Sequence, residues 1–314
     1  MEDWSECLDV AVQVARRAGQ PSSVRSCSGS QSAALVSGSS WVFHFEVSHI
    51  FNVGRFQVVS CAVNQEKQVS SKSTPTDLVT ETDHQVEELI ISTLRQKYPT
   101  HRFIGEESAA AGGRCELSDA PTWIIDPIDG TCNFVHSFPM VAVSIGFAVR
   151  RELEFGVIYH CFEGTLFTGR RGHGAFCDGV RLHVSRESEM SKALILTEIG
   201  AKRDPATLDV FLGNMRRILS APTHGVRIVG SSTLALCQVA SGAAEGYYQY
   251  GLHCWDIAAA AVIIREAGGC VMDTTGAPLD LMSRRVVAAG TPEIAESVLK
   301  LLQPIDYGRD DNDL

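Results

Sequence analysis

The chain has 314 residues, 45% of them hydrophobic and 20% charged, and its formal net charge is −10. This composition is typical of a globular protein that buries a full core as one domain or as two packed halves. The negative charge argues against a nucleic-acid partner, because nucleic-acid binding requires clustered Lys and Arg. No apolar run approaches the roughly 18 residues of a membrane-spanning helix, and the acidic N-terminus does not resemble a secretory signal. We therefore expect a cytoplasmic protein without a membrane partner.

The ten cysteines show no C-x-x-C or C-x-C spacing. Cys161, Cys237 and Cys270 lie inside apolar runs, as reduced core thiols do. This pattern favours neither a zinc site nor disulfide bonds, in line with the expected compartment.

The N-terminal region combines a regular and an irregular part. Residues 4–19 carry apolar side chains at helical spacing, which predicts an amphipathic helix that ends at Gly19. Ser and Gly dominate residues 22–40, and residues 41–47 alternate like a strand that has no evident partner. A structureless connection of this length is unusual inside a compact domain, so we interpret residues 21–65 as a flexible insertion.

Regular structure is predicted again from about Val69. A helix through residues 86–94 has Thr80 or Thr82 as its candidate N-cap, and Asp83 lies in its first turn. Asp83 is read either as a stabiliser of the helix dipole or as a site residue. A short strand follows and runs into an acidic turn with Glu106, for which a plain charged loop is the alternative.

The central stretch is Trp123-Ile124-Ile125-Asp126-Pro127-Ile128-Asp129-Gly130-Thr131. Its apolar residues predict a strand that ends in a turn. Asp126 and Asp129 would repel each other in this turn unless a cation lay between them, and carboxylate and carbonyl oxygens suit Mg²⁺. If Gly130 and Thr131 start a helix, its free N–H groups favour a phosphate beside the metal. The alternative is a solvated Asp-Pro turn.

The remaining residues predict two kinds of architecture. Short β-rich runs at residues 141–149, 152–160, 165–170 and 174–177 indicate an antiparallel meander, and strands alternate with helices from Ala193 onwards. We therefore divide the chain into an α+β half at residues 67–190 and an α/β half at residues 191–304. Between a strand and a helix, Gly230-Ser231-Ser232 is either a ligand-facing turn or a plain connection.

The last strong signal is a nearly apolar helix that starts near His253 and ends at Gly268-Gly269. Asp256 lies at its start, either as an N-cap or as a functional carboxylate at the positive end of a buried helix. A strand at residues 286–289 and a helix at residues 292–302 close the fold. We expect the acidic tail, residues 308–314, to be disordered.

The sequence resembles the inositol monophosphatase family of Mg²⁺-dependent, lithium-sensitive phosphatases. The resemblance rests on the acidic turn at Glu106, the Asp126 loop and the Trp255-Asp256 helix, in this order. It runs from about Lys67 to the C-terminus and includes the first helix. The runs at residues 135–139 and 247–249 are more similar to the second of the family's two vertebrate isozymes. The resemblance implies an α+β fold, a layered αβαβα sandwich of the inositol monophosphatase and fructose bisphosphatase type, as one domain over residues 1–314.

The resemblance also implies roles for individual residues. Two or three Mg²⁺ ions per subunit would be held by Glu106, Asp126, the backbone carbonyl of Ile128, Asp129 and Asp256. Catalysis would involve Thr131, Asp83 and Glu106, of which Thr131 and Asp83 orient and deprotonate the attacking water. The substrate would be contacted by Ile128, Asp129, Gly130, Thr131, Gly230, Ser231, Ser232, Gln249 and Asp256.

The chemistry of phosphate esters explains these residue types. A phosphate monoester dianion repels hydroxide and has a poor leaving group, so catalysis must neutralise charge and generate a nucleophile. Two cations about 4 Å apart achieve this in an in-line displacement by water. Such a mechanism needs no Ser or Cys nucleophile, so we expect no covalent phosphoenzyme.

Two features depart from the family pattern. Residues 21–65 replace the second half of the first helix. The apolar surface that this half would have buried is lost, which is expected to lower the stability of the fold more than it alters the chemistry of the site. Gln249 stands where the other isozyme has a Glu that accepts a hydrogen bond from a ring hydroxyl. Ala201 stands where the other isozyme has a residue with a hydroxyl group. Substrate preference is therefore expected to differ.

These observations lead to one functional hypothesis and two alternatives. We expect a homodimeric, Mg²⁺-dependent phosphatase that acts on a small phosphate monoester, myo-inositol monophosphate. One alternative is a fructose bisphosphatase or a bisphosphate nucleotidase, because these enzymes share the metal loop. The other is a non-catalytic isoform that acts as a dimerisation partner, which the insertion motivates and the complete ligand set opposes.

Overall fold

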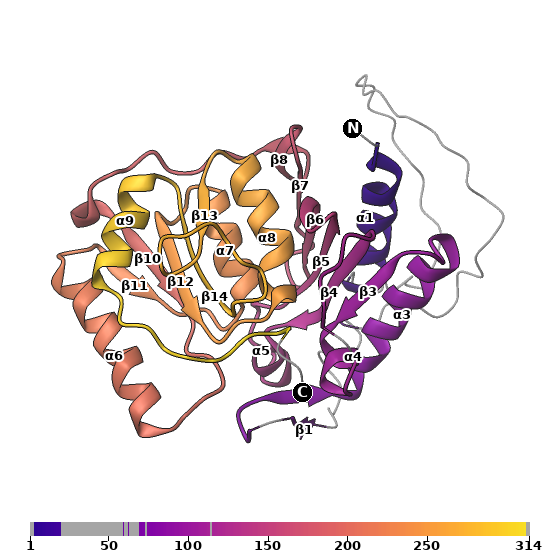
Figure 1. The fold of residues 1–314 in the computed structure, drawn as a ribbon, viewed down its shortest axis with the longest axis horizontal. Coiled ribbons are helices and arrows are strands. Elements are labelled where there is room, and N and C mark those ends of the chain that lie inside the picture. The colour runs from indigo at the N-terminus through magenta and orange to yellow at the C-terminus, as the bar shows by residue number, and fades with distance from the viewer. Residues whose placement is uncertain are drawn as a thin grey trace, which may run out of the picture.

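The computed structural model describes residues 3–19, 59, 62, 69–72, 74–113 and 115–311. Its layers follow the order helix, sheet, helix, sheet, helix (Figure 1). One sheet has seven strands and the other has five, and a two-stranded sheet of β1 (Val69–Ser71) and β2 (Leu78–Thr80) lies apart. This arrangement confirms the predicted layered α+β sandwich.

The seven-stranded sheet lies in the N-terminal half. Its strands follow each other in sequence order: β3 (Arg102–Gly105), β4 (Thr122–Asp129), β5 (Ala142–Val149), β6 (Glu152–His160), β7 (Leu166–Arg170), β8 (Gly174–Cys177) and β9 (Val180–Arg181). β3 is parallel to β4, and every later pair is antiparallel, which confirms the predicted meander. β4 and β5 are buried along their whole length because helices cover both faces of the sheet.

The outer face of this sheet is covered by α1 (Ser5–Gly19) and α3 (Glu81–Lys97), which also contact each other. Thr80 is the N-cap of α3, as one of the two predicted candidates. Val59 is helical and fully buried in the same apolar cluster. The predicted insertion at residues 21–65 otherwise lies outside the described residues, apart from Ala62, and so does the predicted strand at residues 41–47.

The inner layer consists of α7 (Ser232–Ala240) and α8 (Cys254–Glu266). α8 packs on the central strands of the large sheet, and Gly146 of β5 lies at this contact. A Cβ atom at Gly146 would lie 2.7 Å from the Cβ of Ala258, so small residues on both elements allow the helix to approach closely. This close packing fixes the start of α8 relative to β4 and β5.

The five-stranded sheet covers the other side of α7 and α8. Its strands are β10 (Leu194–Thr197), β11 (Gly225–Arg227), β12 (Gly246–Tyr250), β13 (Cys270–Met272) and β14 (Arg285–Ala289). β10 is parallel to β11 and β12, whereas β14 is antiparallel to both its neighbours, so the predicted α/β half contains a mixed sheet. α6 (Pro205–Ser220) and α9 (Pro292–Leu301) form the outer layer.

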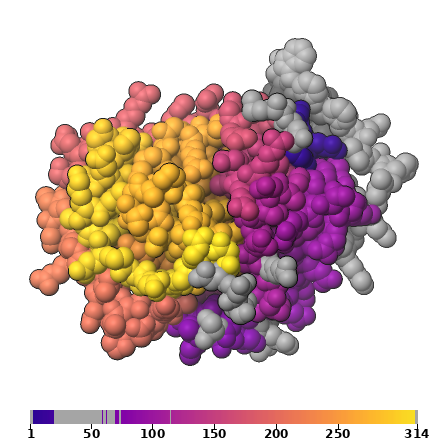
Figure 2. Space-filling model, viewed as in Figure 1, coloured from indigo at the N-terminus to yellow at the C-terminus, as the bar shows by residue number. Residues whose placement is uncertain are grey.

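The acidic tail differs from the prediction. We expected residues 308–314 to be disordered, but residues 308–311 are placed, and the Asp310 side chain is only 3% exposed. Asp310 accepts a hydrogen bond from the backbone N–H of Cys254 at 2.8 Å, which ties the tail to the start of α8. Figure 2 shows this yellow segment along the border between the two halves of the molecule.

No helix in the described ranges is both long and apolar enough to cross a lipid bilayer.

Candidate metal centre and active site

A β-bulge brings Asp126 and Asp129 together. In a regular strand, residues three positions apart point to opposite faces. Here Asp126 pairs with Ser144 and Asp129 with Ala142, so β4 contains one extra residue between them. Pro127, which has no N–H for the ladder, lies inside the bulge. We predicted a turn after the strand, but β4 continues through Asp129 and the bulge turns both carboxylates to the same side.

Asp256 meets these two carboxylates from the second half of the chain. It lies in the first turn of α8, and its Oδ2 accepts a hydrogen bond from the backbone N–H of His253 at 2.7 Å. One oxygen each of Asp126, Asp129 and Asp256 lie within 4.8 Å of one another. Asp256 is not the N-cap, as one interpretation held, because His253 occupies that position and Asp256 is the third helical residue of a capping box; its carboxylate also belongs to the cluster.

Glu106 is the fourth member of the cluster. It is the first residue of α4 (Glu106–Ala110), which directly follows β3. Its negative charge is one of the causes that raise the pKa of Asp126, which places the two carboxylates close together. The structure thus brings Asp126, Asp129 and Asp256 within 4.8 Å of one another, and Glu106 lies near enough for its charge to act on Asp126 and Asp256.

Burial and mutual repulsion act on these acids. Burial raises the pKa of Asp126 well above its usual value, and the charges of Glu106, Asp129 and Asp256 raise it further. Burial and the charge of Asp129 do the same to the pKa of Asp256. A cluster of this kind is costly in its ionised form without a cation, and hard oxygen donors fit Mg²⁺.

Asp129 is held at the start of α7. Its carboxylate accepts hydrogen bonds from the N–H groups of Ser232 and Thr233 at 3.2 and 2.9 Å, and from the hydroxyls of Ser231 and Thr233. Burial raises the pKa of Asp129, while the bonds from Ser231 and Thr233 oppose this rise. Thr233 was not predicted. Its signal in the sequence was only its position one residue after the Gly-Ser-Ser turn.

Glu87 positions α4 and was also missed. Its two carboxylate oxygens accept hydrogen bonds from the backbone N–H groups of Glu107 and Ser108 at 2.7 and 2.8 Å. In the sequence it is one more acidic residue in a helix, with no sign that its side chain reaches another element. It orients Glu106 through the backbone of α4.

If Glu106 is a Mg²⁺ ligand, as predicted, we expect Glu87→Gln to weaken Mg²⁺ binding by about tenfold, because losing a partner that orients a ligand typically costs that much. The variant should also lower the free energy of unfolding by roughly 1–3 kcal/mol, since an NH₂ group would face a backbone N–H donor. Thermal melts at a series of Mg²⁺ concentrations measure both effects. Glu88→Gln, on the exposed side of α3, is the matched control. An unchanged Mg²⁺ midpoint in Glu87→Gln would contradict the positioning role.

Lys72 places a cation against Glu106. Its Nζ lies 2.7 Å from Oε1 of Glu106 and 2.6 Å from Oε1 of Glu107. Burial lowers the pKa of Lys72, but the attraction of Glu106 and Glu107 outweighs this, and the net shift is upward. Burial and Glu106 raise the pKa of Glu107 to about 7. Neither residue was predicted to face the site.

Asp83 and Thr131 form the predicted pair. The Thr131 hydroxyl lies 3.1 Å from Oδ1 of Asp83 and 3.1 Å from the carbonyl oxygen of Ile128. Oδ2 of Asp83 accepts a hydrogen bond from the backbone N–H of Thr80 at 2.9 Å, which completes a capping box. Burial raises the pKa of Asp83. Asp83 therefore stabilises the helix start, as one interpretation held, and it also contacts Thr131, so its role in the site stays a prediction.

Asn133 connects the segment before β5 with the segment before α7. Its Nδ2 donates to the carbonyl oxygens of Met140 and Val229, both at 2.9 Å. Gly130 has φ +89°, and a Cβ atom there would lie 2.7 Å from the Met140 carbonyl oxygen, so only glycine fits. Thr131 starts α5 (Thr131–Val135) and Gly130 is its N-cap, so the condition set for a phosphate-facing helix start is met.

The Gly230-Ser231-Ser232 turn is engaged by the protein itself. Oε1 of Glu198 accepts hydrogen bonds from the N–H groups of Val229 and Gly230 at 2.9 and 3.0 Å. The Ser231 hydroxyl caps α7 and donates to Asp129. These donors, which we expected to face the substrate, have partners within the fold.

Gln249 lies beside this turn on β12 and is 5% exposed. Its Oε1 accepts hydrogen bonds from the hydroxyls of Ser232, at 3.0 Å, and Tyr247. The amide nitrogen has no hydrogen-bond partner among the described residues. Ala201 lies in the loop after β10, where its carbonyl oxygen accepts a bond from the Thr76 hydroxyl at 2.8 Å.

The layered fold and its carboxylate cluster define a hydrolase of phosphate monoesters. The sequence model of the inositol monophosphatase family matches residues 45–307. This chain therefore belongs to the inositol monophosphatase family. The match begins within residues 21–65, so the family model covers part of the segment that we expected to be an insertion.

Individual relatives agree with this assignment. Human inositol monophosphatase 2 is 64% identical over 284 residues, which are 90% of this chain and 98% of that protein. Human inositol monophosphatase 1 is 47% identical over 312 residues, or 99% of both chains. Among solved structures, the extragenic suppressor protein suhB of Bartonella henselae has a TM-score of 0.75 at 27% identity, covering 95% of this chain and 98% of its own. The predicted similarity to the second vertebrate isozyme is confirmed.

Proposed function

We propose that this chain is a Mg²⁺-dependent phosphatase that hydrolyses myo-inositol monophosphates to inositol and phosphate. The observation that carries the proposal is the meeting of Asp126, Asp129 and Asp256 within 4.8 Å, with Glu106 beside them. The names of the relatives support the inositol monophosphate substrate.

The donor set fits Mg²⁺. The proposed ligands are Glu106, Asp126, the Ile128 carbonyl, Asp129 and Asp256, all hard oxygen donors. Burial and neighbouring negative charge raise the pKa values of Asp126 and Asp256, and a cation would neutralise that charge. Two or three bound Mg²⁺ ions would supply positive charge to the phosphate and acidify a water molecule.

The chain's own groups would handle the proton. The Thr131 hydroxyl can accept a hydrogen bond from the attacking water while it donates to Oδ1 of Asp83. Asp83 is kept in place by its bond from Thr80, so the proton would move towards a fixed carboxylate. Oriented donors of this kind lower the barrier without a protein nucleophile.

The substrate would lie between the bulge and β12. The N–H groups of Gly130 and Thr131 would receive the phosphate, as the start of α5 favours an anion. Gln249 would donate from its amide nitrogen to a ring hydroxyl, because its oxygen is occupied by Ser232 and Tyr247.

Substrate comparison tests the proposal. We expect purified protein in Mg²⁺ to release phosphate from inositol 1-phosphate faster than from fructose 1,6-bisphosphate or adenosine 3′,5′-bisphosphate. Fastest turnover of either latter compound would assign the site to a different branch of the same superfamily. Absence of phosphate release from all three would favour the non-catalytic isoform.

Gln249→Glu is expected to change KM for inositol 1-phosphate by about 3- to 10-fold with little change in kcat, since one hydrogen bond to a charged group is worth about 1.5–3 kcal/mol before solvation losses. The new carboxylate can still accept from Ser232 and Tyr247 while its second oxygen accepts from the substrate. Steady-state kinetics on several inositol monophosphate isomers measure the effect. Gln238→Glu, which changes a half-buried residue near the C-terminal end of α7, is the control. Identical isomer preferences in wild type and Gln249→Glu would remove Gln249 from the substrate site.

The family resemblance also supports a cytoplasmic homodimer that lithium inhibits. Light scattering tests the dimer, and inhibition by LiCl but not by NaCl tests the lithium proposal.

A further inference from the structure

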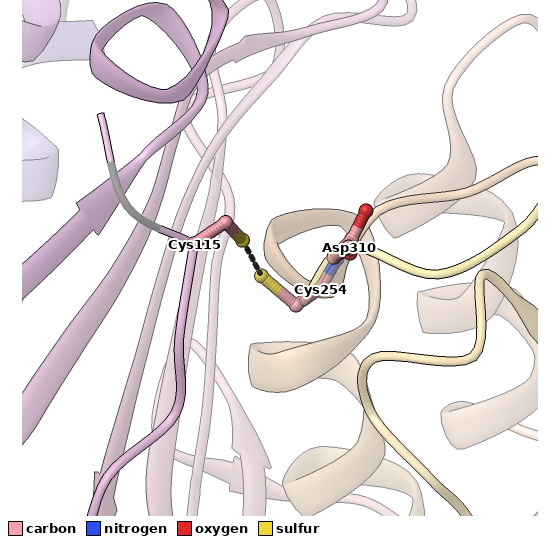
Figure 3. A group of neighbouring side chains, drawn as sticks. All are labelled: Cys115, Cys254 and Asp310. Atoms are coloured by element: carbon pink, nitrogen blue, oxygen red, sulfur yellow. Dashed lines mark hydrogen bonds between the residues drawn. The ribbon is translucent and has the colours of Figure 1, made fainter. Parts of the chain in front are cut away.

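Two cysteine side chains lie close together outside the carboxylate cluster. Sγ of Cys115 and Sγ of Cys254 are 3.7 Å apart, although 139 positions separate the residues in the sequence (Figure 3). Cys254 is the buried first residue of α8, and Cys115 is half-buried in a segment without regular secondary structure. The spacing of the cysteines along the chain predicted no such pair.

We propose that Cys115 and Cys254 form a reversible disulfide bond. A disulfide has an S–S distance near 2.05 Å, so the sulfurs must approach by about 1.7 Å. Cys254 is held in place, because its N–H donates to Oδ2 of Asp310 at 2.8 Å. The approach therefore falls to Cys115, whose backbone is not fixed by a helix or a strand.

Hydrogen peroxide is a sufficient oxidant for this bond. The Cys115 thiol, which is the more accessible of the two, reacts with peroxide to give a sulfenic acid and one water. The Cys254 sulfur then attacks the sulfenic sulfur, the S–S bond forms, and the hydroxyl leaves as a second water. In total the two thiols lose two electrons and two protons to peroxide, which becomes two waters, and a dithiol reductant restores the thiols.

A metal ion is the less favourable occupant of this place. Asp310 is the third side chain that reaches the sulfurs. Its oxygens already accept from the backbone N–H of Cys254 and lie 2.7 Å from Nδ1 of His253. Nε of Arg284 is 3.6 Å from the same carboxylate, and a guanidinium beside the oxygen ligand repels a divalent cation.

The bond would join the two elements that carry acidic groups of the site. Cys115 follows α4, whose first residue is Glu106, and Cys254 precedes Asp256 by two positions in α8. A covalent link at this point would limit the separation of the α4 segment from the start of α8. The link depends on the two sulfurs alone, so it does not rest on the proposed substrate.

Peptide mapping after oxidation tests the proposal. The full-length protein is treated with hydrogen peroxide, its remaining thiols are alkylated, and it is digested with trypsin and a Glu-specific protease. Cleavage after Arg114 and Glu116 separates Cys115 from Cys132, and cleavage after Glu245 and Arg265 releases the peptide 246–265. We expect the dipeptide 115–116 attached to the peptide 246–265, with an intact mass about 2 Da lower than that of the two reduced peptides, and we expect dithiothreitol to separate them.

Three variants and a metal analysis complete the test. Cys115→Ser and Cys254→Ser should each abolish the linked peptide, and either one is enough if the other fails to fold. Cys270→Ser, which removes a half-buried thiol of the five-stranded sheet, should retain it. Free Cys115 and Cys254 after oxidation of the wild type would overturn the proposal. One equivalent of zinc that survives dialysis in the wild type and is lost in Cys115→Ser would also overturn it, because the sulfurs would then hold a metal.

Discussion

Asp126→Asn is expected to lower phosphate release by about 10³-fold or more. Asp126 is 2% exposed and lies among Glu106, Asp129 and Asp256, so its replacement removes a central charge from the proposed metal site. Metal-derived charge stabilisation is worth several kcal/mol in the transition state, and each 1.36 kcal/mol is tenfold in rate. Release of inorganic phosphate from inositol 1-phosphate at saturating Mg²⁺ measures the loss.

The same substitution should raise the melting temperature of the metal-free protein. The pKa of Asp126 is raised by burial and by three neighbouring carboxylates, so ionisation of this side chain is less favourable in the folded than in the unfolded protein and costs stability until a cation binds. Mg²⁺ should therefore stabilise the wild type against heat but leave Asp126→Asn nearly unchanged. Asp119→Asn, an exposed acid of the same half, serves as the control and should behave like the wild type. Equal activity in Asp126→Asn and wild type would contradict the proposed metal centre.

Thr131→Val is expected to lower kcat by about 10²-fold, the scale of a positioned proton-transfer group. Valine keeps the shape of threonine but removes the hydroxyl that lies 3.1 Å from Oδ1 of Asp83. Mg²⁺ affinity should change little, because the proposed ligands are untouched. Steady-state kinetics at several Mg²⁺ concentrations separate the two effects.

Thr131→Ser provides the matched comparison for this prediction. It restores a hydroxyl at the same position and should recover most of the activity. If Thr131→Val and Thr131→Ser lost activity equally, the methyl group and its packing would matter, and the proton path through Asp83 would be wrong. A shift of the Mg²⁺ midpoint in Thr131→Val would instead make Thr131 part of the metal site.

Much of the fold could be predicted from local patterns. The meander from β5 to β8 follows from alternating apolar residues between turns, and α8 follows from a nearly continuous apolar run. Strand ends were less accurate. β4 was expected to stop before the acidic residues, but pairing with β5 continues to Asp129 because a bulge absorbs Pro127.

Parts of the site depended on contacts that local patterns do not contain. Glu87 reaches α4 from α3, and Lys72 reaches Glu106 across 34 positions. The Gly230 amide, which resembled a ligand donor in the sequence, bonds to Glu198 instead. Asp310, in a tail that was expected to be disordered, holds the start of α8. Glu87, Lys72, Glu198 and Asp310 are ordinary polar residues in the sequence. Their roles depend on which residues of other elements they contact in the fold.

The sequence by itself determined the family, the residue types of the proposed metal centre and the positions of the main helices and strands. It did so because carboxylates after a strand and at a helix start indicate a cation-binding site, and because apolar periodicity reports local structure directly. Only the tertiary structure decided that Asp129 contacts the start of α7, 102 positions away, and that Cys115 lies against Cys254. The physical reason is that strand order and layer packing bring distant segments together, whereas periodicity describes only which face of its own element a residue occupies.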